Sequence, residues 1–250
     1  MQLKKINFIN SNGLKFIAAI TMFIDHLGWI FFPKIKILRI IGRLAFPLFA
    51  FMIAEGCRYT RNKLRYLSSV AALALFCQTV LFLVLKSKEM GAPVTFTFSI
   101  IMVYALQNLK SSIFGRRGAV RIVSASALFI GSVGLSFIAN RFLDIDYGFF
   151  GCMLPVFAAL PHKPVCDGYP DGWDKLDCLP LCTATFAVGL AMLCFFSNPL
   201  QWWAMLSVPL LLVYSGRKGK LRTKYFFYVF YPAHLALLYG IAYLIIKLRT

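Results

Sequence analysis

Nine apolar runs decide what this chain can fold into. They cover most of its 250 residues and are separated by short polar or basic segments. A helix needs about 20 apolar residues to cross the ~30 Å hydrocarbon core of a bilayer, and most of the runs approach that length. The sequence therefore predicts an all-α, polytopic integral-membrane helical bundle of about nine transmembrane helices, with eight to ten as the range.

The expected helices follow from run length and flanking charge. The fourth, sixth and eighth runs are the short ones, expected to tilt little or to be partly re-entrant. No internal repeat or soluble domain is visible, so 1–250 is expected to form a single membrane domain with a polar cytoplasmic loop at about 161–178. The runs are 14–32, 37–57, 66–86, 94–109, 120–140, 147–161, 178–196, 199–214 and 225–247.

Composition supports the membrane class and excludes a nucleic-acid partner. The chain is 60% hydrophobic and 14% charged, and its mean hydropathy is +0.73. Its net charge of +18 comes from 27 Lys and Arg against 9 Asp and Glu. No polar, basic domain exists to carry nucleic-acid binding, so membrane lipids are the expected partners.

The basic residues also predict the orientation of the chain. With the N-terminus in the cytoplasm, 17 of them fall in cytoplasmic segments, seven on the opposite side and three inside the runs. This asymmetry favours a cytoplasmic N-terminus and an odd number of helices. The first run follows MQLKKINFINSNG and has no small-residue cleavage site, so it is expected to stay as a span.

Charged residues interrupt the first two runs. The stretch ITMFIDHLGWIFFP places Asp25 beside His26, where a charge at the bilayer centre costs about 2.5–3.5 kcal/mol. Neighbouring helical residues point about 100° apart, so the two side chains need separate partners. Arg43, which shares a helix face with Arg39, lies at matching depth and is predicted to pair with Asp25. The pair could be a structural link or could orient a site, and both interpretations stay open.

Two of the three histidines, His26 and His234, lie inside apolar runs. A single histidine there is often a packing residue, but two of them near an arginine and a carboxylate favour chemistry. An imidazole with a pKa near 6.5 takes and gives protons at neutral pH. His26 is the preferred catalytic residue and His234 the second candidate. Pro47 and Pro232 are expected to interrupt their helices.

The end of the second run is strongly polar. Its segment AEGCRYTRNK is either an ordinary cytoplasmic loop or a cationic mouth for a phosphorylated ligand. Under the second interpretation it forms the cofactor-binding site. Its candidate residues are Glu55, Arg58, Tyr59, Arg61 and Lys63.

Two further polar islands are expected to bind substrate. The segment DIDYGFFG supplies Asp146 and Tyr147, and YVFYPAHLALLY supplies Tyr231.

The loop PHKPVCDGYPDGWDKLDCLPLC carries Cys166, Cys178 and Cys182, whose spacing is not that of a standard zinc site. Its aspartates do not fit an EF-hand, so no metal is expected.

Four blocks resemble the TraX family in order and spacing. They are IDHLGWIFFP, LRIIGRLAFPLFAFMIAEGCRYTRN, DIDYGFFGCMLPVF and FYVFYPAHLALLY. TraX proteins are integral-membrane proteins named for the conjugation protein that N-acetylates F-type pilin. They are similar in plan to transmembrane acyltransferases that use acyl-coenzyme A. The resemblance covers most of the chain and departs in the loop 161–180.

The resemblance implies acetyl transfer from acetyl-CoA across or within the membrane, which is expected to be the bacterial inner membrane. It does not identify the acceptor, which is expected to be an amine or hydroxyl of a peptide, a glycan or a lipid-linked molecule. It implies that His26 matches the membrane-embedded histidine of the family, with Asp25 beside it. The other matching polar positions are Arg43, Glu55, Arg58, Asp146, Tyr147 and His234.

The resulting hypothesis is an acyl-CoA-dependent O- or N-acetyltransferase. Arg58, Arg61 and Lys63 would meet the phosphates of acetyl-CoA, and His26 would act as general base or acyl carrier. Arg43 or Tyr231 would stabilise the oxyanion. The alternative is a proton-coupled transporter or flippase built on the same Asp, His and Arg side chains, although the chain lacks an inverted repeat. A homodimer is left open.

Overall fold

The chain folds into two compact units. Unit 1 comprises residues 1–49 and 198–250, and unit 2 comprises residues 50–197. The expectation of a single membrane domain stays a prediction. The computed structural model describes residues 9–86, 88–115, 117–164, 172–217, 219 and 224–249.

Among the described residues the regular elements are all helices, joined by turns and loops that contain two isolated bridges, which confirms the all-α prediction. Unit 1 contains α1 (Ser11–Phe31), α2 (Lys36–Gly42), the 3₁₀ helix η1 (Pro199–Leu206), α10 (Ser207–Leu212) and α11 (Lys224–Arg249). The helix α3 (Ala45–Tyr59) starts in unit 1 and continues into unit 2. Unit 2 also contains α4 (Lys63–Leu85), α5 (Ala92–Phe114), α6 (Ala119–Phe142), α7 (Gly148–Ala159), α8 (Trp173–Leu176) and α9 (Leu179–Phe195).

Each predicted apolar run corresponds to a helical segment, so the polytopic architecture is confirmed. Within the described residues, six segments are long and apolar enough to cross a membrane. Three shorter ones match the sixth, seventh and eighth runs, and their crossing stays a prediction. The six are Ser11–Phe31, Lys36–Tyr59, Lys63–Leu83, Ala92–Phe114, Ala119–Phe142 and Phe226–Leu248, and the three are Gly148–Ala159, Leu179–Phe195 and Pro199–Leu212.

The second span is broken where α2 ends and α3 begins. Arg43 and Leu44 form the turn between them. Pro47 has no N–H to donate to the carbonyl of residue 43, so the helix breaks four residues before the proline. The interruption expected at Pro232 is not seen, because α11 continues through it. A span helix tolerates the loss of one backbone bond.

The fourth span is longer than the sequence suggested. We expected the helix to cover 94–109 and to end before Lys110, but α5 runs for 23 residues to Phe114. Its last turns carry polar side chains that are nevertheless buried, including Gln107, Lys110 and Ser112. We placed the end of this helix too early because we took its polar residues to be exposed. In the structure these side chains are buried against protein.

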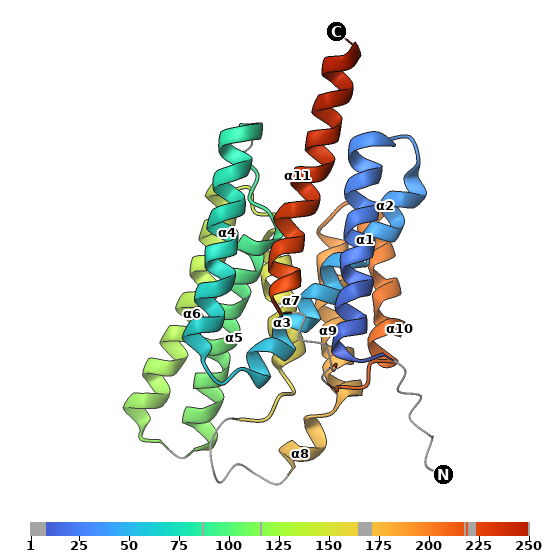
Figure 1. The fold of residues 1–250 in the computed structure, drawn as a ribbon. Coiled ribbons are helices and arrows are strands. Elements are labelled where there is room, and N and C mark those ends of the chain that lie inside the picture. The colour runs from blue at the N-terminus through green and yellow to red at the C-terminus, as the bar shows by residue number, and fades with distance from the viewer. Residues whose placement is uncertain are drawn as a thin grey trace, which may run out of the picture. The chain divides into compact units, whose positions relative to one another are not determined.

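Unit 1 is organised around α1, which packs against α2 and α11, while α2 also contacts η1 (Figure 1). Close approach of α1 and α2 depends on Gly28, where an added Cβ would lie 2.7 Å from Leu38 Cβ. Leu14, Leu211 and Leu238 are fully buried in this unit. The α1–α2 hairpin therefore brings the block IDHLGWIFFP next to the start of the block LRIIGRLAFPLFAFMIAEGCRYTRN.

Unit 2 is organised around α5, which contacts α4, α6 and α7, and α7 packs in turn on α9 (Figure 1). The side chain of Ser99 on α5 donates to the Cys152 carbonyl on α7 at 2.8 Å. Phe51 and Phe186 meet edge to face, with ring centroids 5.4 Å apart. A conventional apolar core thus holds this unit together.

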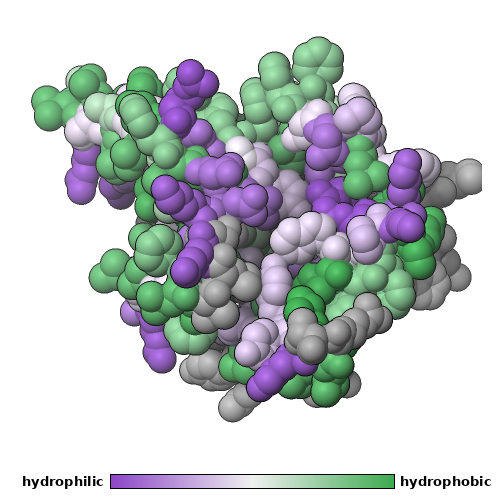
Figure 2. All heavy atoms as spheres, turned by 90° about the horizontal axis from the view of Figure 1, so that it is seen from above, coloured by the Kyte–Doolittle hydropathy of each residue, from purple (hydrophilic) through white to green (hydrophobic). Residues whose placement is uncertain are grey.

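Many large apolar side chains remain exposed, as expected of a surface in contact with lipid. Leu75 on α4 is 71% exposed, and Val120 on α6 is 85% exposed. Figure 2, a view from above, shows hydrophobic residues beside groups of hydrophilic ones. A water-soluble protein rarely exposes apolar surface on this scale.

Candidate functional site

The first cluster of unit 1 is an arginine–aspartate cluster made of Asp25, Arg39, Arg43 and Gln201. Arg43 Nη2 donates to both carboxylate oxygens of Asp25, at 3.2 and 3.0 Å. Arg39 Nη1 lies 2.9 Å from Asp25 Oδ2. Arg43 Nη1 donates to Gln201 Oε1 at 3.3 Å. The predicted Asp25–Arg43 ion pair is confirmed, and a second arginine shares the carboxylate.

Local sequence explains how this cluster forms. Arg43 sits at the break between α2 and α3, and Asp25 is buried on α1. A Cβ added to Gly42 would collide with the Asp25 carboxylate and its Cβ. A glycine at the end of α2 therefore lets that helix approach the carboxylate closely enough for both arginines to reach it.

The second cluster of unit 1 is a histidine pair. His234 Nε2 on α11 lies 3.2 Å from His26 Nδ1 on α1. His234 is 3% exposed, His26 is half-buried, and Phe230 stacks on the His234 ring at 4.9 Å. Residues 208 positions apart in the chain therefore form one site.

Hydrogen-bond geometry decides which nitrogens carry protons. His26 Nδ1 lies 3.0 Å from the Met22 carbonyl, and His234 Nδ1 lies 2.8 Å from the Phe230 carbonyl. A carbonyl only accepts, so each Nδ1 must carry the proton. The single proton on His26 Nδ1 is then shared, because both the Met22 carbonyl and His234 Nε2 accept from it. With both rings neutral, no other assignment satisfies all three contacts, and His26 Nε2 is left with its lone pair.

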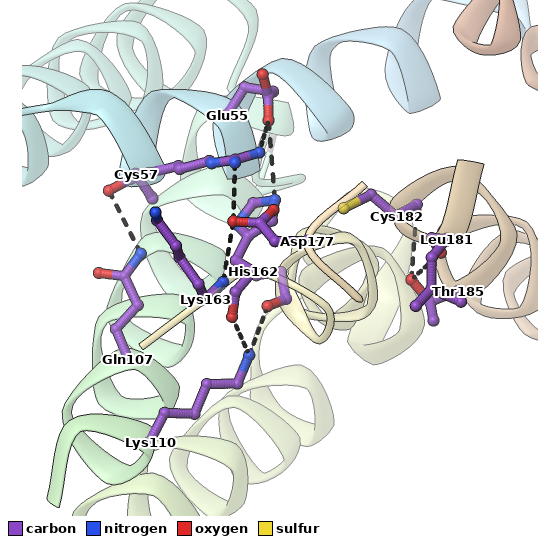
Figure 3. A network of polar contacts seen from close by, with 12 residues as sticks. Glu55, Cys57, Gln107, Lys110, His162, Lys163, Asp177, Leu181, Cys182 and Thr185 are labelled. Atoms are coloured by element: carbon purple, nitrogen blue, oxygen red, sulfur yellow. Dashed lines mark hydrogen bonds and ion pairs between the residues drawn. The ribbon is translucent and has the colours of Figure 1, made fainter. Parts of the chain in front are cut away.

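Unit 2 contains a different kind of polar site, which we call the unit 2 charge cluster: Glu55, Arg58, Lys110, His162 and Asp177. Figure 3 shows its contacts. Arg58 Nη2 lies 2.8 Å from Asp177 Oδ2, and Arg58 Nη1 lies 3.7 Å from Glu55 Oε1. The same Asp177 oxygen accepts from the Lys163 backbone N–H at 3.1 Å. The Arg58 guanidinium is thus occupied by two carboxylates.

Lys110 closes the other side of this cluster. Its ammonium donates to the carbonyls of Ala159, Leu160 and His162, at 2.9, 2.6 and 3.0 Å. These groups belong to the C-terminal end of α7 and the following residues, where carbonyls lack helical partners. Lys110 also lies over the Trp173 ring at 5.2 Å. Lys110 therefore connects α5 to the C-terminal end of α7.

His162 is the titratable group between these charges. Burial, together with the positive charges of Arg58 and Lys110, lowers its pKa to about 3. The imidazole is therefore neutral at pH 7, and its 3.8 Å approach to Glu55 Oε1 is not an ion pair. Its buried Nδ1 has no hydrogen-bond partner among the residues that the structure describes.

Comparison with known proteins places these sites in a family. The family model of the TraX protein matches residues 10–242. The chain belongs to the TraX family. That match covers both units. It includes all six residues of the histidine pair and the arginine–aspartate cluster.

Two curated relatives of this TraX-family chain were found. The "Probable fimbrial assembly protein FimC, serogroup H1" of Dichelobacter nodosus is 29% identical over 244 residues, which cover 90% of this chain and 92% of that protein. An uncharacterized protein of Rickettsia prowazekii (strain Madrid E) is 39% identical over 69 residues, which cover 28% of this chain and 27% of that protein. No solved structure matches significantly.

The structure of the TraX-family chain brings some predicted site residues together. In unit 1, Tyr231 lies near His234, with ring centroids 5.8 Å apart. In unit 2, Tyr59 lies beneath the Arg58 guanidinium at 5.1 Å. Arg61 and Lys63 are exposed. Their cofactor role stays a prediction.

The island around Asp146 and Tyr147 is organised by its backbone. Asp146 N donates to the Met90 carbonyl at 2.8 Å, and Thr95 Oγ1 donates to the Asp146 carbonyl at 2.7 Å. Tyr147 adopts a left-handed conformation with φ of 63°, which is uncommon for a residue with a side chain. Its substrate role stays a prediction.

Several contact residues escaped the sequence reasoning. Nothing in the sequence marks Gln201, which meets Arg43 across 158 positions. Arg39 carried a signal, since it shares a helix face with Arg43, but its contact with Asp25 was not foreseen. Lys110 and Asp177 lay outside the predicted apolar runs, although both carry buried contacts.

The cysteine-rich loop is only partly covered. Cys166 and the nearby Asp167 and Asp171 lie outside the described residues. Cys178 and Cys182 are free thiols. Among the described residues, no group of three or more His, Cys, Asp or Glu is arranged to hold a metal ion.

Proposed function

We propose that this TraX-family chain is a membrane-embedded acetyltransferase that moves an acetyl group from acetyl-CoA to an amine or hydroxyl acceptor. The observation that carries the proposal is the histidine pair, which leaves His26 Nε2 as a basic nitrogen. Family membership and the full-length fimbrial relative support it. The name of the Dichelobacter nodosus relative favours a peptide acceptor of the fimbrial-subunit type.

The proposed reaction uses His26 Nε2 as general base. It takes the proton of the acceptor N–H or O–H as that atom attacks the thioester carbonyl carbon. The C–S bond then breaks, and the proton passes from the imidazolium to the departing thiolate, giving acetylated acceptor and coenzyme A. While His26 is charged, its Nδ1–H is held by the Met22 carbonyl and by His234 Nε2.

His234 is a positioning residue in this proposal. It accepts from His26 Nδ1–H, which fixes the tautomer of His26 and aims Nε2 at the acceptor. Replacing His234 by Leu should lower kcat about tenfold or more with little change in KM, while Gln, whose Oε1 can accept in place of Nε2, should restore part of the rate. Equal rates for the Leu and Gln variants would remove this role.

Acetyl-CoA phosphates are assigned to the exposed Arg61 and Lys63. We do not assign Arg58 to that contact, because its guanidinium already bridges Glu55 and Asp177. Changing Arg61 to Gln should raise the KM for acetyl-CoA severalfold, as expected when one phosphate contact is lost.

The direct experiment is label transfer. Purified protein in lipid nanodiscs is given radiolabelled acetyl-CoA and a peptide with a free N-terminus, and acetyl-peptide and free coenzyme A are measured. His26→Gln should lower the rate about 10²–10⁴-fold, while Thr79→Val, at an exposed position on α4, should not change it. Full activity of His26→Gln would overturn the role of His26. Proton uptake into proteoliposomes without any acetyl transfer would instead favour the transporter.

A further inference from the structure

We propose that the corner between α1 and α2 binds the phosphate of an anionic phospholipid headgroup, with Arg39 as its main contact. The proposal does not depend on acetyl transfer. It starts from charge: Asp25 is the only Asp or Glu in unit 1, which carries 14 of the 27 Lys and Arg residues. No second side-chain carboxylate is available there to balance a buried arginine.

The contacts of Asp25 show that the excess of positive charge lies at the arginine–aspartate cluster. Asp25 receives Arg43 Nη2 on both oxygens and Arg39 Nη1 on Oδ2. One negative charge between two guanidiniums leaves a positive charge. That charge lies in a segment, Lys36–Tyr59, that is long and apolar enough to cross a membrane. A net positive charge inside a span is costly, and unit 1 has no second Asp or Glu to offset it, so we place the second anion in the lipid.

Arg39 is the arginine that this anion can reach. Its side chain is 27% exposed, against 10% for Arg43. It lies three residues from the start of α2, about 5 Å along the helix axis. That depth is close to the end of the span, where a long basic side chain extends toward the headgroups.

The surrounding surface favours a lipid over a soluble phosphate. Trp29 and Phe32 are 52% and 46% exposed at this corner. Lys34 and Lys36 are exposed beside them. Aromatic rings concentrate at membrane interfaces, and basic residues beside them attract anionic headgroups. A soluble phosphate would gain nothing from the apolar side chains.

Lipid retention measured by native mass spectrometry tests the proposal. The protein is released from nanodiscs that contain phosphatidylglycerol and phosphatidylcholine, and the retained lipids are counted. Wild type should retain phosphatidylglycerol preferentially, and Arg39→Gln should lower that retention about fivefold. Arg39→Lys keeps the charge and should retain most of the preference. Arg141→Gln, at an exposed arginine in the last turn of α6, is the matched control.

Other outcomes would overturn the proposal. If Arg39→Gln does not fold, the exposed pair Lys34→Gln and Lys36→Gln provides a second test, and unchanged retention in that variant would count against the site. Equal retention of both lipids by wild type would do the same. Displacement of the lipid by millimolar inorganic phosphate or coenzyme A would show that a soluble phosphate is the ligand.

Discussion

The two units handle buried charge in opposite ways. Unit 1 has one acidic residue against 14 basic ones, and unit 2 has eight against 13. In unit 1, two arginines share Asp25, and His26 Nε2 keeps its lone pair. In unit 2, two carboxylates share one arginine. We therefore propose that the unit 2 charge cluster maintains the fold, while unit 1 retains groups that can meet a substrate or ligand.

The largest expected effect on stability tests the unit 2 charge cluster. Arg58→Gln would leave Glu55 and Asp177 buried without their cation and should lower the free energy of unfolding by about 3–5 kcal/mol. Equilibrium unfolding in mixed micelles measures it. Arg61→Gln is the matched control, because Arg61 is exposed on the adjacent turn and should change stability little. Equal stability of the two variants would contradict a structural cluster.

A smaller effect is expected from removing the cation that caps α7. Lys110→Met keeps the length of the side chain but strips three carbonyls of their donor. The cost should be about 1.5–3 kcal/mol, the range for hydrogen bonds to a charged group. Lys88→Met, at an exposed lysine, should be neutral. A similar loss in both variants would mean that charge alone, not the cap, matters.

Gly42→Ala disturbs the arginine–aspartate cluster of unit 1. The new methyl group would collide with Asp25, so the cost should be about 1–3 kcal/mol, with a loss of acetyl transfer. Gly131→Ala on α6 is the control, since its Cβ would meet nothing within 4 Å. Measuring melting temperature and activity of both variants separates crowding from helix propensity. Normal activity of Gly42→Ala would show that the approach of α2 to Asp25 is not needed.

The smallest effect comes from His162. Its pKa is about 3 in the folded protein and near 6.5 when unfolded, so only the unfolded state gains a proton between those values. Its contribution to stability is therefore complete above about pH 6.5 and is lost as the pH falls, by at most ~1.4 kcal/mol per pH unit. Unfolding measured at pH 7.5 and 5.5 should show this slope in wild type. The slope should be reduced in His162→Gln, and an unchanged slope would assign the titration to another group.

The sequence predicted the helices better than their ends. Hydrophobic run length located every apolar segment, because the bilayer imposes a nearly fixed span. It failed at the end of α5, since Gln107 and Lys110 are polar yet buried against protein. It anticipated a disturbance near Pro47, but not that the span would divide at Arg43 and Leu44.

The candidate site was predicted in part for a similar reason. Matching depth on adjacent helices was enough to pair Asp25 with Arg43. The contact between His26 and His234 joins the first and last spans, and no local pattern reports a contact over that separation. Gln201 and Asp177 became visible only through packing, which depends on long-range contacts that a single sequence does not encode in any periodic form.

One comparison tests the proposed division between the units most directly: the acetyl-transfer rate per folded molecule for His26→Gln and Lys110→Met, each isolated as a monodisperse fraction below its melting temperature. We predict that His26→Gln keeps the melting temperature of wild type and loses about 10²-fold or more in rate. Lys110→Met should have a lower melting temperature than wild type but should transfer acetyl groups at nearly the wild-type rate. The opposite pattern, with activity retained in His26→Gln and lost in folded Lys110→Met, would contradict the assignment of chemistry to unit 1.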